Sequence, residues 1–344
     1  MPQENLLFLD RKDVLTCLDG MDPVQVVTQV LRDQAAGRTE IPSEGYLSWR
    51  NGEDAYSRSI AMLGALHRPE GSVYGMKLIN ASVSNPARGM ERACGLSFVF
   101  DSETARTKLI AEAGYLSAVR TAAYTMASLR ALGPAEWDGI TLVGAGTLAR
   151  AHLDLLTRAF PDVHRVVVHD VSEERAEELA RWTAAHHPGL KVTVSGSAAR
   201  AVAATSVVVT VTTSDVPYIP ADWIMPGTFL AHVSLADFTE EVYASAEAVY
   251  GDDLDLIEEN PRRIMGRLMA EGKLVRPGAA GARPGRAVTG TLGEVLLGRV
   301  PAVRPTKGHV LSNPFGMSIL DVGLIDAVRL RAEEIGLGRR LTLF

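Results

Sequence analysis

The chain has 344 residues, 47% of them hydrophobic, which is enough to bury a large core and to form two domains. Its net charge of −6 at pH 7 argues against nucleic acid or an anionic membrane as a partner. The first residues lack the pattern of a signal peptide, no apolar run is long enough to cross a bilayer, and the two cysteines lie far apart in sequence, so we expect a cytoplasmic protein with reduced thiols.

The first 128 residues mix helix and strand patterns. Asp22 followed by Pro23 is typical of the start of an amphipathic helix. Gly133 and Pro134 predict the end of a second helix, over 116–132, and a domain junction. The strands expected between these helices cover 59–63, 73–79, 96–100 and 108–112, with a hairpin turn at 101–104.

Beyond Asp138, short apolar strands alternate with helices, which predicts an α/β fold with a doubly wound parallel sheet of the Rossmann type. A flexible loop is expected at 278–285. The helical tail over 318–335 cannot complete a domain alone, so we expect it to fold back onto the N-terminal region. The predicted domains are therefore 1–128 with 312–344, and 129–311. The strands expected in the second domain are 140–143, 165–169, 191–194, 206–212, 228–233 and 248–250.

A glycine turn of the form G-x-G-x-x-A joins the first of these strands to a helix. Gly144 permits a tight turn, and Gly146 has no side chain to keep the backbone away from a pyrophosphate. Ala149 is small enough to let the helix pack closely on the strand. The N–H groups near Thr147 and Leu148 would face the phosphates at the positive end of the helix dipole.

Asp170 ends the next strand, at the spacing expected of a dinucleotide fold. Its carboxylate can accept hydrogen bonds from both ribose hydroxyls and would repel a 2′-phosphate. The pattern therefore favours NAD over NADP as cofactor. The alternative is a Rossmann-like fold that binds no nucleotide. The histidines show no metal-ligand spacing, so no metal is expected.

Lys77 lies in a strand that is otherwise apolar or small. A buried lysine is costly unless it is paired, which suggests an anionic partner or a tuned pKa. Alternatively, Lys77 extends to solvent from an edge strand.

Three arginines are candidates for binding anions. Arg58 and Arg120 stand among small residues that would let a guanidinium reach a carboxylate or a phosphate, although each alone would more often form a surface ion pair. Arg92 is similar, but Glu91 is an obvious local partner. Glu112 is either an acid/base or a structural partner for an arginine.

Polar residues follow the strands of the second domain. Asp237 falls at a carboxyl end, where it could exchange a proton with a substrate nitrogen, or could cap the helix that follows. Thr212 and Thr213 could contact ribose or phosphate, or could reflect β-propensity alone. Asn313 begins a restricted turn that could present its amide to a ligand.

Together these residues resemble the ornithine cyclodeaminase/mu-crystallin family over nearly the whole chain, and within it the diaminopropionate-forming branch. Ornithine cyclodeaminases usually have a Ser-Thr-Gly turn where this chain has Asn-Pro-Phe-Gly, which argues against cyclodeaminase activity. The segments that carry the likeness are 75–79, 85–86, 90–95, 120–123, 144–149, 217–219, 232–237, 313–317 and the tail from 335.

The resemblance implies a role for each candidate residue. Lys77 and Arg58 would bind a substrate carboxylate, Arg120 would lie between that carboxylate and a cofactor phosphate, and Asp237 would be the acid/base. Thr147, Leu148, Asp170 and Thr213 match the family's cofactor contacts. Arg92 replaces a smaller residue of the cyclodeaminases, which we interpret as a sign of a substrate with more carboxylates. We therefore expect Asp237 and Lys77 to be catalytic, Arg58, Lys77, Arg92, Arg120 and Asn313 to bind substrate, and Arg120, Gly144, Gly146, Thr147, Leu148, Asp170 and Thr213 to bind NAD.

The reaction that this implies is NAD-dependent oxidative cleavage of N-(2-amino-2-carboxyethyl)-L-glutamate to 2-oxoglutarate and L-2,3-diaminopropionate, in siderophore or peptide antibiotic biosynthesis. The family also implies a homodimer formed through the first domain. One alternative is another reaction of the same family, ornithine cyclodeamination or imino acid reduction. A second is a non-catalytic NAD-dependent binding protein.

Overall fold

The computed structural model describes residues 5–278 and 285–342, so most of the loop predicted at 278–285 lies outside the described residues. The chain divides into two compact units. Unit 1 comprises Met1–Arg120 and Met317–Phe344, and unit 2 comprises Thr121–Gly316. The first boundary falls inside helix α3 (Gly114–Leu132), the same helix that contains the predicted boundary at residue 128.

Unit 1 is built on a mixed sheet whose strand order is β18-β1-β7-β6-β5-β4-β2, with β3 also paired to β4. All pairs are antiparallel except β1 with β7. The strands are β1 (Asn5–Leu9), β2 (Thr39–Glu40), β3 (Gly45–Arg50), β4 (Tyr56–Arg68), β5 (Gly71–Ser82), β6 (Ala93–Phe100), β7 (Thr107–Glu112) and β18 (Arg339–Thr342). The helices are α1 (Arg11–Asp19), α2 (Pro23–Ala35), the short η1 (Pro86–Arg88), the start of α3, and α11 (Ser318–Glu334).

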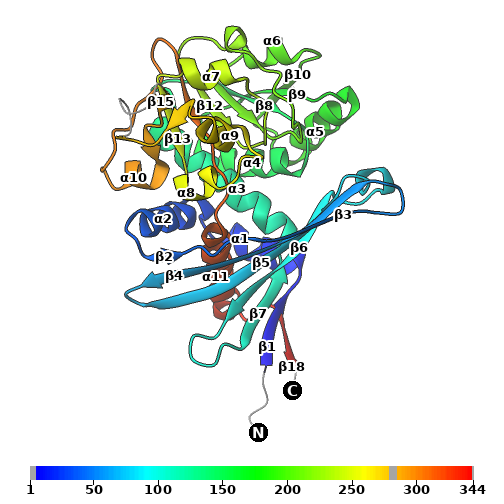
Figure 1. Cartoon of the computed structure of the whole chain (residues 1–344). Coiled ribbons are helices and arrows are strands. Elements are labelled where there is room, and N and C mark those ends of the chain that lie inside the picture. Colours follow the sequence, from blue (N-terminus) through cyan, green and yellow to red (C-terminus); the bar gives the residue numbers. More distant parts are fainter. Residues whose placement is uncertain (1–4, 279–284, 343–344) are drawn as a thin grey trace. The chain divides into compact units, whose positions relative to one another are not determined.

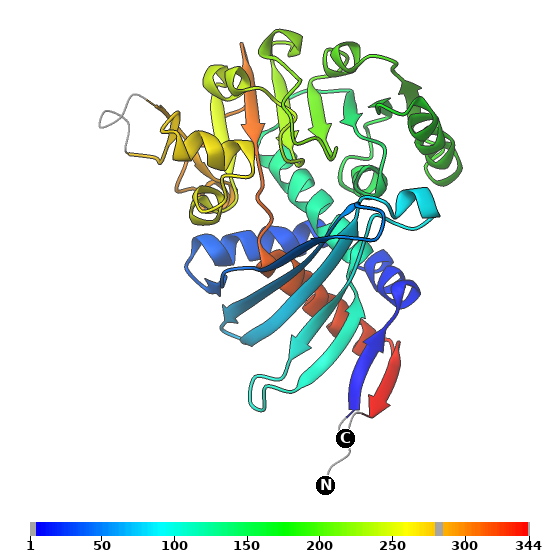
Figure 2. The ribbon, with the colours of Figure 1, turned by 45° about the vertical axis from the view of Figure 1, so that its right-hand side comes forward.

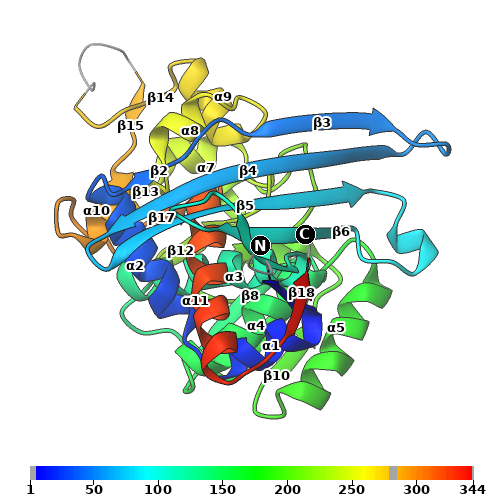
Figure 3. The ribbon, with the colours of Figure 1, turned by 90° about the horizontal axis from the view of Figure 1, so that it is seen from below.

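Helix α11, the predicted C-terminal helix, runs across β4, β5 and β6 (Figures 1 and 3). Two glycines allow this close approach. A Cβ on Gly64 would lie 2.9 Å from Ser318 Oγ, and one on Gly75 would lie 3.2 Å from a methyl carbon of Val322. The C-terminal segment therefore belongs to unit 1, and α11 brings Asp321 onto the sheet beside β5.

The opposite face of this sheet, which we call the outer face, is apolar and exposed. Side chains alternate along each strand, so residues out of phase with Gly64 and Gly75 point away from α11. Five large side chains on this face are at least 36% exposed: Leu47, Trp49, Leu63, Tyr74 and Leu96.

Unit 2 contains an all-parallel sheet (Figure 2). Its strand order is β10-β9-β8-β11-β12-β17-β13-β16. The strands are β8 (Gly139–Val143), β9 (Arg165–His169), β10 (Lys191–Val194), β11 (Val207–Thr210), β12 (Thr228–His232), β13 (Ala248–Gly251), β16 (Gly290–Thr291) and β17 (His309–Ser312), with a separate pair β14 (Leu274–Val275) and β15 (Arg286–Ala287). The helices are the rest of α3, α4 (Thr147–Ala159), α5 (Glu173–His186), α6 (Ala198–Val202), η2 (Ala221–Trp223), α7 (Glu240–Ser245), α8 (Leu254–Glu258), α9 (Ile264–Ala270) and α10 (Leu292–Leu296).

The first five of these strands follow the Rossmann order, with the direction of winding reversing between β8 and β11. The predicted doubly wound sheet is confirmed, and the six expected strands match the observed ones to within two residues at each end. The sequence did not predict that β17 lies between β12 and β13. In the described part of the chain, no helix combines the length and apolarity needed to span a membrane.

Candidate active site

The glycine turn of unit 2 requires glycine at position 144. Gly144 has φ +107°, and a Cβ there would lie 2.9 Å from the backbone of Val211. Its N–H donates to His169 O at 2.7 Å, which ties the turn to β9. By contrast, a Cβ on Gly146 would meet nothing within 4 Å. A side chain there would project into open space directly before helix α4.

The start of α4 and the end of β9 provide what a dinucleotide needs. Gly146 is the N-cap of α4 and supplies no side-chain cap, and no partner for the Thr147 or Leu148 N–H exists among the described residues. Asp170 accepts the Ala145 N–H at 2.8 Å and the Ser172 N–H at 2.9 Å. The carboxylate therefore stands beside the turn, and these residues fit a pyrophosphate and a ribose.

Asp237 is fully buried in the segment that follows β12. Its carboxylate accepts hydrogen bonds from Thr212 Oγ1 at 2.5 Å and from the Ser234 hydroxyl. Burial raises its pKa to about 6, against the lowering effect of Thr212, Thr210 and Tyr218 hydroxyls. The alternative role as a helix cap is wrong, because Thr239 occupies the N-cap of α7.

A second layer of hydrogen bonds supports Asp237. His232 Nε2 accepts the Asp237 N–H at 3.1 Å, so its Nδ1 carries the proton and donates to Tyr243 Oη at 2.6 Å. Tyr243 in turn donates to Asn313 Oδ1 at 3.0 Å, and Asn313 Nδ2 donates to His232 O at 2.6 Å. Burial lowers the pKa of His232 to about 3, so the ring stays neutral.

This network includes Asn313, which the sequence predicted to bind substrate. Its side chain is 3% exposed and its amide is engaged on both sides within unit 2. Both polar atoms of the Asn313 amide therefore have partners within unit 2, and its contact with a substrate stays a prediction.

The two threonines after β11 differ. The Thr212 hydroxyl donates to Asp237 and accepts the Ser214 N–H at 3.0 Å. Thr213, by contrast, is exposed. Thr213 is thus the one of the pair with a side chain accessible to a cofactor. Tyr218, which the sequence did not single out as a site residue, lies near Asp237, and its hydroxyl lowers the pKa of that carboxyl.

In unit 1, Lys77 lies on β5, between β4 and β6, and is 2% exposed. The alternative of an edge lysine reaching solvent is therefore wrong. Its Nζ donates to Asp321 Oδ2 at 2.7 Å and to Ser117 Oγ at 3.3 Å. Arg120 Nε donates to the other oxygen of Asp321 at 3.2 Å. Lys77 therefore has the anionic partner that its burial predicted, although the sequence did not identify Asp321.

Arg58 and Arg92 are a second pair of cations in unit 1. Neither has a carboxylate partner among the described residues, and burial together with repulsion from Arg58 lowers the pKa of Arg92. The expected local pair with Glu91 is wrong, because Glu91 binds Arg11 at 2.5 Å. Glu112 also binds Arg11, at 2.8 Å, so it is a structural partner.

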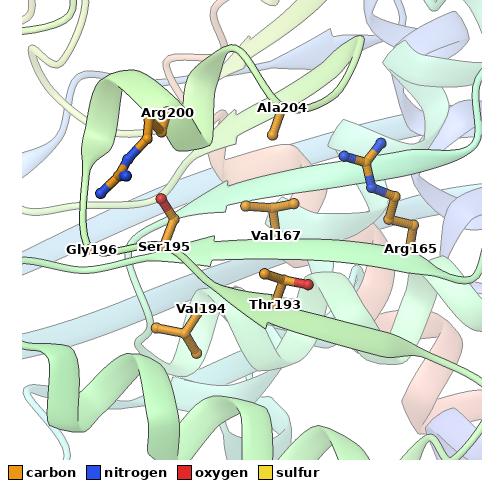
Figure 4. A pocket seen from close by; sticks show the side chains of 8 residues that line it. All are labelled: Arg165, Val167, Thr193, Val194, Ser195, Gly196, Arg200 and Ala204. Carbon is orange, nitrogen blue, oxygen red and sulfur yellow. The ribbon is translucent and has the colours of Figure 1, made fainter.

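None of the candidate site residues lines the pocket shown in Figure 4. That pocket has a volume of about 390 Å³ and lies on β9, β10 and α6. No cluster of three or more potential metal ligands occurs in the described ranges. The pocket is lined by Arg165, Val167, Thr193, Val194, Ser195, Gly196, Arg200 and Ala204.

Known proteins of one family match this chain over nearly its whole length. The model of the ornithine cyclodeaminase/mu-crystallin family matches residues 6–336. The crystal structure of CmnK is 52% identical, with a TM-score of 0.92 and 99% of each chain covered. N-((2S)-2-amino-2-carboxyethyl)-L-glutamate dehydrogenase of Staphylococcus aureus is 29% identical over 98% of this chain and 99% of its own. An archaeal alanine dehydrogenase dimer with bound NAD shares the fold at 22% identity and a TM-score of 0.83, covering 99% of this chain and all of its own.

Proposed function

Because the chain belongs to the ornithine cyclodeaminase/mu-crystallin family, we propose that it oxidatively cleaves N-(2-amino-2-carboxyethyl)-L-glutamate. The protein is an NAD-dependent oxidoreductase. The proposed reaction consumes the conjugate, NAD⁺ and water, and produces 2-oxoglutarate, L-2,3-diaminopropionate, NADH and a proton. This choice of substrate is based on the number of positive charges among the candidate residues of unit 1.

The candidate anion-binding residues of unit 1 are four cations, and one carboxylate, Asp321, is bound to two of them. Lys77 and Arg120 share Asp321, while Arg58 and Arg92 have no acidic partner in the described part of the chain. Asp321 is the one carboxylate that these cations bind directly among the described residues, so three of the four positive charges have no carboxylate of their own. The proposed substrate carries three carboxylates, two on its glutamate half and one on its aminopropionate half. A monocarboxylate such as alanine or ornithine would leave Arg58 and Arg92 facing each other unneutralised.

The cofactor fits the residues of unit 2. Gly144, Gly146 and the first N–H groups of α4 would hold the pyrophosphate, and Asp170 would hold a ribose. When bound, NAD⁺ supplies a hydride acceptor. The cations of unit 1 would orient the glutamate Cα–H bond, since correct placement contributes much of the acceleration.

Asp237 would carry the protons. As a carboxylate it would take the proton from the substrate nitrogen when the Cα–N bond is oxidised to an imine. It would return that proton to the imine nitrogen, then remove a proton from the attacking water and deliver it to the departing nitrogen, while the carbinolamine hydroxyl gives up the proton that is released. Its pKa of about 6 suits a group that must accept and release protons near neutral pH.

We further propose that the chain forms a homodimer through the outer face of unit 1, where five large apolar side chains are exposed. The diaminopropionate produced would serve siderophore or peptide antibiotic assembly. A partner enzyme would then supply the conjugate from O-phosphoserine and glutamate.

The test is turnover of purified protein with NAD⁺ and a panel of N-linked glutamate conjugates, ornithine and alanine. We expect NADH, 2-oxoglutarate and diaminopropionate from the conjugate alone, identified by mass. Arg92→Ala should raise KM for the conjugate while leaving NAD⁺ affinity unchanged. Conversion of ornithine to proline without net NADH would instead establish cyclodeamination. If Asp237→Asn supported the biological role in cells, the non-catalytic binding function would be favoured.

A further inference from the structure

Asp321 joins three segments that are far apart in the sequence. It projects from α11 and binds Lys77 of β5 at 2.7 Å and Arg120 of α3 at 3.2 Å. Lys77 and Asp321 are 2% and 1% exposed, and the Arg120 side chain is 12% exposed. Each oxygen of the carboxylate therefore accepts from a different cation.

Asp321 offsets the repulsion between the Lys77 and Arg120 charges. Burial lowers the pKa of Lys77, and the nearby Arg120 charge lowers it further, while Asp321 and, more weakly, Glu44 favour the protonated amine. Without Asp321, two cations would face each other in a dry region. Lys77 would then lose its proton more readily and would move away from Arg120.

Donors remain available after Asp321 is bound. Lys77 has three N–H groups and uses two, on Asp321 and Ser117. Arg120 uses Nε on Asp321 and one terminal nitrogen on Ser117, so its other terminal nitrogen has no partner within the described ranges. Because two cations share one carboxylate, the three side chains together carry a net charge of +1.

We propose that Asp321 is a positioning residue that holds Lys77 and Arg120 side by side and charged, so that together they bind one carboxylate of the substrate. The proposal rests on the assignment of these cations to substrate binding. It gives the C-terminal helix an indirect part in that binding, because Asp321 acts through the two cations.

A purely structural role for Asp321 predicts that its loss lowers stability without weakening the binding of a carboxylate. Buried ion pairs often contribute little net stability, and breaking one by removing a single partner destabilises the fold whatever the site does. Asp326 provides a matched control: it lies on the same helix, is 7% exposed, and binds Arg329 at 2.8 Å. Both Asp321→Asn and Asp326→Asn should lower the unfolding temperature.

Binding of 2-oxoglutarate, measured by calorimetry without NAD, tests the proposal apart from turnover. We expect Asp321→Asn to weaken binding at pH 7 by about 10- to 100-fold, as for loss of a charged hydrogen bond. Binding should also weaken at a lower pH than in the wild type, because Lys77 loses its proton earlier. Asp321→Glu, which keeps the charge but shifts it, should fall between the two, and Asp326→Asn should bind normally.

Equal affinity of the Asp321→Asn and Asp326→Asn variants would overturn the proposal. If Asp321→Asn does not fold, wild-type affinity in Asp321→Glu would overturn it. Failure of the wild type to cleave the glutamate conjugate, with 2-oxoglutarate binding still dependent on Asp321, would reject the proposed substrate but leave the role of Asp321 intact.

Discussion

Thr212 donates a hydrogen bond to the Asp237 carboxylate across 2.5 Å, and its own oxygen accepts the Ser214 N–H at 3.0 Å. Because the Ser214 N–H occupies the acceptor side of this hydroxyl, the hydroxyl proton is directed at Asp237. The bond favours the charged form of a carboxyl that burial otherwise holds protonated. Thr212 therefore helps to set the pH at which the proposed base becomes active.

Thr212→Val should move the acidic limb of the kcat/KM profile to higher pH. A hydrogen bond to a charged group contributes about 1.5–3 kcal/mol, and one pKa unit is about 1.4 kcal/mol, so a shift of roughly one to two units above pH 6 is expected. Thr228→Val is the control, since Thr228 lies at the other end of β12 and its hydroxyl donates to Met225 O. If the acidic limb of the profile stays at the same pH in Thr212→Val, this bond does not affect the pKa of Asp237.

Asp237 should also make stability depend on pH. Its pKa is raised from 3.8 to about 6 on folding, so its favourable contribution is complete below pH 4 and is lost as pH rises through 6. The loss amounts to about 3 kcal/mol over the full range, and to roughly 1–2 kcal/mol between pH 5 and pH 8. Asp237→Asn lacks this dependence.

Urea unfolding of both proteins at pH 5 and pH 8 measures the difference. The variant should gain stability relative to the wild type at the higher pH while losing turnover. Parallel behaviour of the two proteins would mean that Asp237 titrates normally in the folded state.

Local patterns predicted unit 2 well. The apolar strands, the Gly144 turn and the acid at Asp170 are each defined by a few neighbouring residues, and Asp237 could be placed because parallel strands present their carboxyl ends at one edge. The choice between a base and a helix cap for Asp237 could not be made from the sequence. The cap is excluded only because Thr239 takes that position, and the bond from Thr212 comes from 25 residues earlier in the chain.

Unit 1 depends on contacts that short patterns do not encode. Strand β1 pairs with β18 across nearly the whole chain, and neither strand was expected. Asp321 lies in a helix recognisable by its periodicity, but its partner Lys77 is 244 residues away. The burial of Lys77 predicted that an anion exists, and only the tertiary structure identifies which one.

Asp170 should decide which cofactor binds. Asp170→Asn keeps an oxygen that can accept the Ala145 N–H but removes the charge that repels a 2′-phosphate, so it should bind NADP more tightly with a modest loss for NAD. Asp170→Ala loses the bond to the turn as well and should weaken both cofactors, NAD by about tenfold or more. Fluorescence titration measures all four affinities. Equal binding of NAD and NADP by the wild type would contradict the assignment.

The outer face of unit 1 should control assembly. In a two-fold dimer each substitution occurs on both protomers, so one charge buried in an apolar contact acts twice. Leu63→Arg or Leu96→Arg, from strands β4 and β6, should therefore raise the dissociation constant at least 100-fold in sedimentation equilibrium. Leu330→Arg is the matched control, since Leu330 is 54% exposed on α11, away from that face. If all three variants sediment as the wild type does, the exposed leucines of the sheet are not an interface, and if Leu330→Arg alone dissociates, the contact runs through the C-terminal helix instead.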